Sequence, residues 1–325
     1  HRDLHSFPTR RSSDLNSPLL SIIIPTYNRP KLLPRAVNSA LSQTLSDIEI
    51  IVVDDGSTPA VQLPPQARLN VVHLNPNQGG AAARNQGAAA ATARWITYLD
   101  DDDVLLPDMA EKALAAIQQI PQHLPTPVAI LFGLTIVNTQ GQGLETHLPP
   151  TLPRGNHFCL EEIPPKESFF SKQTLVVERE VLLAMGGFDP SFTSRVHTEL
   201  FLRLNPVCSL WGIPEVTYHL SAHGEGRVSS NPRQRQQNFE RLLAKHQALF
   251  ASHSRKRFAD FILNHADMLQ RSGQSWPAAK ALGQALTAQP IHTLARLGSP
   301  YKNQVLKTFS DIRARLAVSI SQPGA

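Results

Sequence analysis

Short apolar segments alternate with helical segments through the first hundred residues of this 325-residue chain. Four apolar runs of strand length are found at residues 20–25, 48–53, 69–74 and 95–99. Between the first two, apolar side chains recur at the 3.6-residue spacing of a helix, and an alanine-rich helical segment precedes the fourth. This alternation predicts an α/β fold: a Rossmann-like, mostly parallel sheet flanked by helices.

Polar residues follow these apolar runs. The second run ends in Asp54-Asp55-Gly56-Ser57, the third leads into Asn77-Gln78-Gly79-Gly80, and the fourth ends in four aspartates at residues 100–103. Strands of an open α/β sheet present ligand-binding residues at their carboxyl ends. We therefore expect these segments to serve one ligand.

The four consecutive aspartates are the most specific of these features. Like charges this close repel one another, and a hard divalent cation such as Mg²⁺ or Mn²⁺ would relieve the repulsion through carboxylate ligands. An acidic helix start is the alternative, because a helical pattern begins near Asp108 and its dipole would favour nearby carboxylates. Both interpretations stay open from this motif alone.

The glycines before the alanine-rich helix favour a phosphate group. Gly79 lets the backbone approach a ligand at a helix start, and Arg84 adds a fork of donors. Asp54 and Asp55 are placed to meet ribose hydroxyls or base nitrogens. The chain has neither the G-x-G-x-x-G pattern of dehydrogenases after its first strand nor a P-loop motif.

Together, residues 21–29 (SIIIPTYNR), 52–57 (VVDDGS), 77–85 (NQGGAAARN) and 98–103 (YLDDDD) resemble family 2 glycosyltransferases of the GT-A fold. The resemblance covers roughly residues 18–230. It implies an inverting, hexosyltransferase-type enzyme with a nucleotide-diphosphate-sugar donor and Mn²⁺ or Mg²⁺ as cofactor.

The resemblance also assigns roles to matching positions. Tyr27 and Asp55 would contact the base, Asp100 would face the ribose, and Asp102 would ligate the metal as part of a D-x-D element. The residues expected to bind the nucleotide-sugar are Pro25, Thr26, Tyr27, Asp54, Asp55, Gly79, Arg84, Asp100, Asp101, His223 and Arg227.

The general base is where the chain departs from the family pattern. Residues 185–190 (MGGFDP) resemble the family's G-G-F-D segment, but His197 stands at the position of its usual catalytic aspartate. Histidine can accept a proton at neutral pH, and Glu199 is the nearby alternative base. The departure also leaves open a non-catalytic module that binds a sugar-nucleotide.

We expect three regions: a non-native or disordered leader at 1–15, a GT-A domain at 16–230, and a basic helical region at 231–325. The chain's net charge of +5 comes from the last region, because the part before residue 227 is net negative. The basic residues either form a solvated face or contact a membrane surface peripherally. Nucleic-acid binding is disfavoured, since only 6% of residues are aromatic and no recognition motif occurs.

The acceptor is expected to be a glycan or a lipid-linked sugar in cell-surface polysaccharide biosynthesis. The Pro- and Gly-rich residues 139–171 predict a long loop that could recognise it. A nucleotidyltransferase is the enzymatic alternative.

Two cysteines are too few for a disulfide scaffold, and the longest apolar stretch is too short to span a bilayer. These features favour a cytoplasmic protein, or one peripheral at the inner face of the membrane.

Overall fold

The computed structural model describes residues 17–222 and 231–297, and the chain divides after Leu242 into two compact units. The predicted leader and the proposed domain limits stay predictions.

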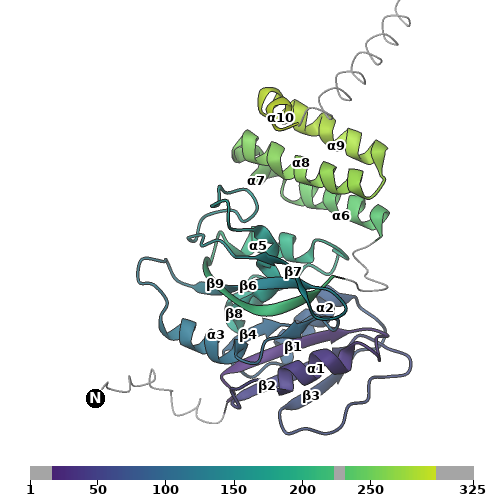
Figure 1. The fold of residues 1–325 in the computed structure, drawn as a ribbon, viewed down its shortest axis with the longest axis vertical. Coiled ribbons are helices and arrows are strands. Elements are labelled where there is room, and N and C mark those ends of the chain that lie inside the picture. The colour runs from purple at the N-terminus through teal and green to yellow at the C-terminus, as the bar shows by residue number, and fades with distance from the viewer. Residues whose placement is uncertain (1–16, 223–230, 298–325) are drawn as a thin grey trace, which may run out of the picture. The chain divides into compact units, whose positions relative to one another are not determined.

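The first unit contains the sheet and its helices (Figure 1). Its elements are β1 (Leu20–Thr26), α1 (Leu33–Leu41), β2 (Ile48–Asp54), β3 (Leu69–His73), α2 (Gly80–Ala90), β4 (Trp95–Tyr98), β5 (Val104–Leu105), α3 (Met109–Gln118), β6 (Val128–Val137), β7 (Gly143–His147), the 3-10 helix η2 (Phe169–Thr174), β8 (Val176–Glu178), α4 (Arg179–Ala184), α5 (Val196–Leu204), β9 (Ser209–Ser221) and most of α6 (Pro232–Lys245).

The nine-stranded sheet has the order β3-β2-β1-β4-β8-β6-β9-β5, and β7 pairs with β6. The pairs β3–β2, β2–β1 and β1–β4 are parallel, which confirms the predicted β-α-β alternation. Beyond β4 the sheet is mixed: β8 runs antiparallel to β4 and β6, whereas β6 and β9 are parallel. The fold class is therefore α/β with a parallel amino-terminal half.

The prediction of a long loop at residues 139–171 is wrong in part, because β7 lies inside this segment and pairs antiparallel with β6. A turn closed by the Gly141 amide, which donates to the Asn138 carbonyl at 3.0 Å, connects the two strands. The first four residues of β7 are exposed, so β7 lacks the apolar alternation by which a strand is recognised.

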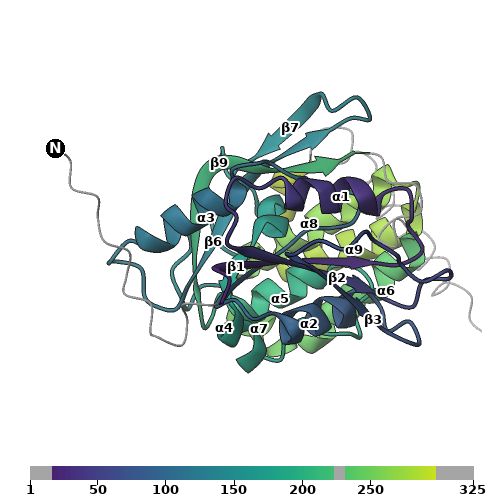
Figure 2. The ribbon, with the colours of Figure 1, turned by 90° about the horizontal axis from the view of Figure 1, so that it is seen from below.

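Helices cover both faces of the parallel half, and Figure 2 shows α1 and α2 on opposite sides of β1 and β2. Ile22 and Ile24 belong to the core cluster that contains residues of α1 and α3, whereas Ile23 belongs to the cluster on the α2 side. Successive strand residues point to opposite faces, so a strand buried on both sides needs a continuous apolar run. At Gly87 of α2, a Cβ atom would lie 2.3 Å from Ile23 Cγ2, which explains the glycine.

The second unit is helical in its described part, with α7 (Gln247–Ser252), α8 (Arg255–Arg271), α9 (Ser275–Ala288) and α10 (Pro290–Arg296). These helices lie in the region predicted to be helical, and residues 298–325 of that region lie outside the described residues. Phe250 packs against Phe258 and Phe261 with ring centroids 4.9 and 5.6 Å apart. None of the helices in the described ranges has the length and hydrophobicity that crossing a bilayer requires.

Candidate active site

The carboxyl ends of β1, β2 and β4 meet at one edge of the sheet. Thr26 at the end of β1 is in register with Asp54 at the end of β2, and only Leu99 separates β4 from the four aspartates. The Thr26 hydroxyl donates to Asp101 Oδ2 at 2.7 Å, which joins the first predicted segment to the fourth. The structure therefore brings these segments together, as the parallel pattern predicts.

Three of the four aspartates converge. Asp100, Asp102 and Asp103 each offer a carboxylate oxygen, and these oxygens lie within 4.8 Å of one another. Asp101 points to Thr26 and Arg29 instead. Clustered carboxylate oxygens are the donor set that Mg²⁺ and Mn²⁺ prefer, so the residues present fit a divalent ion.

Crowding in this cluster changes the protonation of its carboxyl groups. Burial, together with the charges of Asp100 and Asp102, raises the pKa of Asp103 to about 8. Burial also raises the pKa of Asp101 to about 6, against the hydrogen bond from Thr26 and the charge of Arg29. The cluster thus holds more negative charge than its surroundings solvate, and a cation would relieve it.

Two arginines that the sequence did not single out reach the aspartates. Arg29 Nη1 lies 2.9 Å from Asp101 Oδ1 and 3.1 Å from Asp102 Oδ2. Arg35 of α1 donates to the Asp102 carbonyl and, at 2.6 Å, to the Ser221 hydroxyl. Arg29 is the last residue of the motif at 21–29, and this position was the sequence signal that could have marked it as a site residue. Nothing in the local pattern around Arg35 indicates this contact.

The side chains of Asp54 and Asp55 are buried and hold loops. Asp54 accepts from the amides of Ser57 at 3.0 Å and Val61 at 2.8 Å. Burial opposes its ionisation, but hydrogen bonds led by that of Ser57 lower its pKa. Asp55 accepts from the amides of Gln78 at 2.7 Å and Gly79 at 2.8 Å.

These contacts leave Asp54 and Asp55 2% exposed, so both carboxylates hold the loops that they bind in place. The amide of Gly79, predicted to face phosphate, donates to Asp55 in this structure. Tyr27, predicted to contact the base, is 47% exposed. Pro25 is buried in β1.

Arg84 and His197 lie around Phe188 of the G-G-F-D segment. The Arg84 guanidinium pairs with Asp100 and lies 5.7 Å from the Phe188 ring centroid. The His197 ring lies 5.6 Å from the same ring, edge to face. Arg84 Nε is buried without a hydrogen-bond partner. Arg84 and the predicted base, His197, therefore both lie against Phe188.

His197 is neutral in this environment. Burial, followed by the charge of Arg84, lowers its pKa to about 3, and Asp100 opposes that shift. It is 9% exposed, and within the described residues its imidazole makes no hydrogen bond. A neutral imidazole can accept a proton, although a low pKa makes it a weak base.

Glu199, the alternative base, is fully buried and paired with Arg203. Arg203 Nε and Nη2 each lie 2.6 Å from a Glu199 oxygen. The same guanidinium donates to the carbonyls of Met185 at 3.0 Å and Gly187 at 2.7 Å. This geometry favours a structural role for Glu199 in holding the G-G-F-D turn. His223 and Arg227, also predicted for the site, lie outside the described residues.

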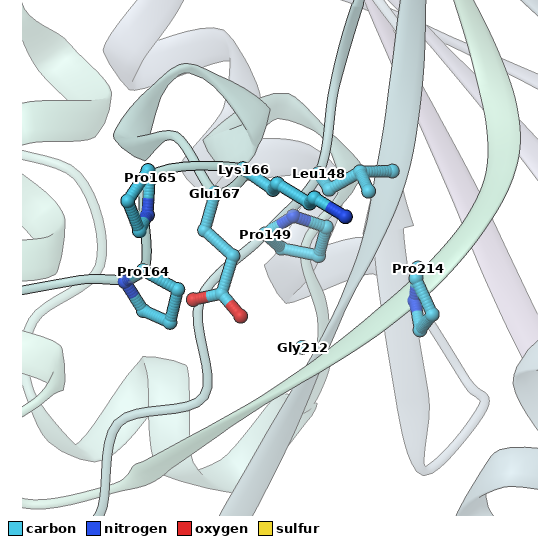
Figure 3. A pocket seen from close by; sticks show the side chains of 8 residues that line it. All are labelled: Leu148, Pro149, Pro164, Pro165, Lys166, Glu167, Gly212 and Pro214. Carbon is cyan, nitrogen blue, oxygen red and sulfur yellow. The ribbon is translucent and has the colours of Figure 1, made fainter.

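A separate cavity of about 440 Å³ is lined by four prolines and their neighbours (Figure 3). Its walls come from Leu148, Pro149, residues 164–167, Gly212 and Pro214. None of the predicted site residues lines it, so this cavity adds nothing to the site at the strand ends.

Comparison with known proteins decides the family. The model of "Glycosyl transferase family 2" matches residues 21–172. The putative colanic acid biosynthesis glycosyl transferase WcaA of Escherichia coli is 31% identical over 253 residues, which cover 74% of this chain and 86% of WcaA. The chain belongs to glycosyltransferase family 2.

Other family 2 relatives match shorter parts of the chain. An uncharacterised glycosyltransferase of Haemophilus influenzae is 29% identical over 188 residues, 57% of this chain and 62% of that protein. The succinoglycan biosynthesis protein ExoO of Rhizobium meliloti is 41% identical over 111 residues, 32% of each chain.

Solved structures confirm the GT-A fold. Residues 1–349 of Staphylococcus aureus TarS in complex with UDP superpose with a TM-score of 0.59 at 19% identity, covering 90% of this chain and 87% of that one. The complex of the same fragment with UDP-GlcNAc gives a TM-score of 0.58 at 18% identity, covering 85% and 83%. At this identity the likeness concerns the fold.

Proposed function

We propose that this family 2 member is a metal-dependent inverting glycosyltransferase that moves a sugar from a nucleotide-diphosphate-sugar to a glycan or lipid-linked acceptor in cell-surface polysaccharide biosynthesis. The observation that carries the proposal is the convergence of Asp100, Asp102 and Asp103 at the carboxyl ends of the strands. WcaA and ExoO, both named for polysaccharide biosynthesis, support the pathway class.

In this proposal the nucleotide lies along the strand ends, with Tyr27 against the base and Arg84 near the diphosphate. Asp102, with Asp100 and Asp103 beside it, would hold Mn²⁺ or Mg²⁺ as a D-x-D element. Bound there, the ion supplies positive charge that stabilises the leaving diphosphate. Arg29, which pairs with Asp102 in this structure, would move toward the diphosphate when the ion binds.

The transfer step needs a base on the acceptor side. The acceptor oxygen bonds to the anomeric carbon while the bond from that carbon to the diphosphate oxygen breaks. His197 Nε2 or Nδ1 takes the hydroxyl proton, because Glu199 is occupied by Arg203.

Cytoplasmic location, with peripheral contact at the inner face of the membrane through the basic region after residue 231, belongs to the same proposal.

A module that binds the sugar-nucleotide without transferring it is the second candidate. The observation that favours it is the low pKa of His197, because a low pKa makes this imidazole a weak base at the position of the family's catalytic aspartate.

One set of assays separates the two. We expect the chain with Mn²⁺ to bind one nucleoside diphosphate, and to hydrolyse the matching sugar donor or transfer its sugar. UDP-GlcNAc is the first donor to test, because TarS was crystallised with it.

Calorimetry with a chelator, and with Asp102→Ala, should show strongly weakened binding of the nucleoside diphosphate. Asp108→Ala is the matched control, because Asp108 pairs with Lys112 away from the cluster. Equal binding without metal would contradict the metal site, and binding without turnover of any donor would favour the module.

A further inference from the structure

The proline-lined cavity lies in the same unit as the aspartates but in a different place. Gly212, which lines the cavity, pairs with Leu131 of β6, whereas Ser221, whose amide holds Asp103, pairs with Val137. Leu131 and Val137 are six residues apart in β6, which corresponds to roughly 20 Å along a strand. The cavity volume of about 440 Å³ falls within the range of about 300–1,000 Å³ that small-molecule sites occupy.

The walls of the cavity are held together by close backbone contacts. The Ser168 amide donates to the Leu148 carbonyl at 2.8 Å, which joins two of the three segments that form the walls. A Cβ at Gly212 would lie 2.5 Å from the Pro149 carbonyl oxygen, so glycine permits the close approach of the third segment. Proline rings fix the backbone angle φ, and a cavity with rigid walls loses little entropy when a ligand binds.

Glu167 brings a carboxylate without a partner to this cavity. Figure 3 shows its side chain extending toward Pro164 and Gly212, whereas the Lys166 ammonium extends toward Leu148. Among the residues that the structure describes, none forms a hydrogen bond or an ion pair with the Glu167 carboxylate, and burial raises its pKa. A half-buried carboxylate without a partner is unfavourable, so a ligand that donates hydrogen bonds to it is favoured.

The chemistry of the walls selects the class of ligand. Four prolines and Leu148 present C–H surface, whereas Glu167 accepts hydrogen bonds and Lys166 donates them. The carboxylate would repel a phosphate or an acidic sugar, and an acyl chain would leave both charges without partners. One carboxylate is too few ligands for a metal ion. A neutral pyranose fits both kinds of surface, because its C–H faces are apolar and its edge carries neighbouring hydroxyl groups.

We propose that this cavity is a second saccharide site, which holds a neutral hexose unit of the acceptor glycan at a distance from the end that reacts. This rests on the proposed function, because a polysaccharide acceptor offers further sugar units to bind. Glu167 would accept hydrogen bonds from two neighbouring hydroxyls, Lys166 would donate to a sugar oxygen, and the C–H face would pack on the prolines. A second contact of this kind would strengthen acceptor binding through multivalency.

The test measures binding of simple sugars to the whole chain by saturation-transfer difference NMR. The probes are the methyl glycosides of glucose, galactose, mannose, N-acetylglucosamine, fucose and rhamnose. Sorbitol is the reference, because it carries hydroxyl groups without a ring that offers a C–H face. Mg²⁺ and the nucleoside diphosphate that the chain binds best are present at saturation, so that the donor site is filled. Titration of each sugar gives an apparent Kd.

We expect at least one glycoside to bind more tightly than sorbitol. Glu167→Met should weaken that glycoside by about tenfold or more, the loss expected for hydrogen bonds to a charged group. Glu167→Gln should keep part of the affinity, because its amide oxygen still accepts a hydrogen bond. Glu180→Met, at an exposed position of α4, is the matched control. Asp102→Ala should bind the glycoside as wild type does, because Asp102 does not line the cavity.

Thermal unfolding without sugar separates a ligand-binding role of Glu167 from a structural one. Because its carboxylate has no partner, Glu167→Met should unfold at the same temperature as wild type or at a higher one. A carboxylate that held the fold together would make this variant unfold at a lower temperature.

Three results would overturn the proposal: no glycoside that binds more tightly than sorbitol, an unchanged Kd in Glu167→Met, and a lower unfolding temperature of that variant. Nucleoside diphosphate binding is measured in the same samples. Its absence in the wild type would count against the proposed function, whereas its presence without glycoside binding counts against this inference alone.

Discussion

The Asn85 side chain holds the backbone of Phe188 at both polar groups: Nδ2 donates to the Phe188 carbonyl at 2.7 Å, and Oδ1 accepts from the Phe188 amide at 2.8 Å. The preceding Gly187 has φ +64°, and a Cβ there would lie 2.3 Å from Asn85 Oδ1. This pair joins α2, which carries Arg84, to the segment that leads to His197. One side-chain amide therefore joins the two segments that carry Arg84 and the proposed base, His197.

Replacing that amide should loosen the site. Asn85→Ala removes two hydrogen bonds to a buried backbone segment, so we expect a loss of about 1–3 kcal/mol in the free energy of unfolding by urea. Transfer should fall more than nucleoside diphosphate affinity, because the contact orients the acceptor side. Asn38→Ala on exposed α1 surface is the control. Unchanged stability in Asn85→Ala would contradict the structural role.

Arg29 should compete with the metal ion. Its guanidinium lies between Asp101 and Asp102, where it neutralises charge that a divalent ion would otherwise neutralise. Without nucleotide, Arg29→Met should raise Mn²⁺ affinity by roughly 3- to 10-fold, measured by electron paramagnetic resonance titration. Lys31→Met, an exposed cation two residues away, should have little effect. Weaker Mn²⁺ binding in Arg29→Met would show that the arginine organises the aspartates instead.

Glu199 and Arg203 should behave as one unit. Glu199→Gln leaves Arg203 without its bidentate partner, and we expect a loss of about 2–4 kcal/mol in stability. Arg203→Met alone should cost a similar amount, because it leaves the Glu199 carboxylate buried without its partner. In the double variant the costs should not add, and the coupling measured by a double-mutant cycle should exceed about 1 kcal/mol. Additive costs would separate the two residues.

Catalysis by His197 should be insensitive to acid over the working range. Because its pKa is about 3, the imidazole is already neutral at pH 5, and transfer should not decline through protonation of His197 between pH 8 and pH 5. His197→Ala should keep donor affinity and lose roughly 10²- to 10⁴-fold in transfer rate. His197→Asp should restore part of that rate. Normal transfer in His197→Ala, with none in folded Glu199→Gln, would assign the base to Glu199.

The same pKa predicts an acid-sensitive fold. In unfolded chains histidine titrates near 6.5, whereas folded His197 titrates at about 3. Between these values the unfolded state binds the extra proton, so stability is full above about pH 6.5 and falls as pH decreases, by at most about 1.4 kcal/mol per pH unit. His197→Gln should show a shallower loss between pH 7 and pH 5 in urea unfolding. Parallel pH profiles would mean that His197 is solvated.

The sequence predicts the parallel half of the fold because its signals are local. An apolar run that ends in aspartate or glycine marks a buried strand and its ligand-facing end, and parallel pairing then brings Thr26, Asp54 and Asp100 to one edge. The Glu199–Arg203 pair also has a readable signal in its i, i+4 spacing. These features depend on neighbours in the chain.

Other features depend on distant parts of the chain and were missed. Arg35 reaches Ser221 across 186 positions, and no local pattern specifies that contact. The buried carboxylates of Asp54 and Asp55 bind backbone amides of loops whose course the sequence does not define. β9 contains Pro214 and a register shift against β6, so its residues do not alternate as in a regular strand.

Asp103 is held from β9 rather than from its own segment. The Tyr218 hydroxyl donates to one of its oxygens and the Ser221 amide to the other, both at 2.8 Å. A ligand that changes the charge of the aspartates therefore also acts on the carboxyl end of β9. By thermodynamic reciprocity, anything that shifts that end of β9 must change the affinity of the aspartates by the same factor. A ligand bound at that end of β9 and a ligand bound by the aspartates should therefore have coupled affinities.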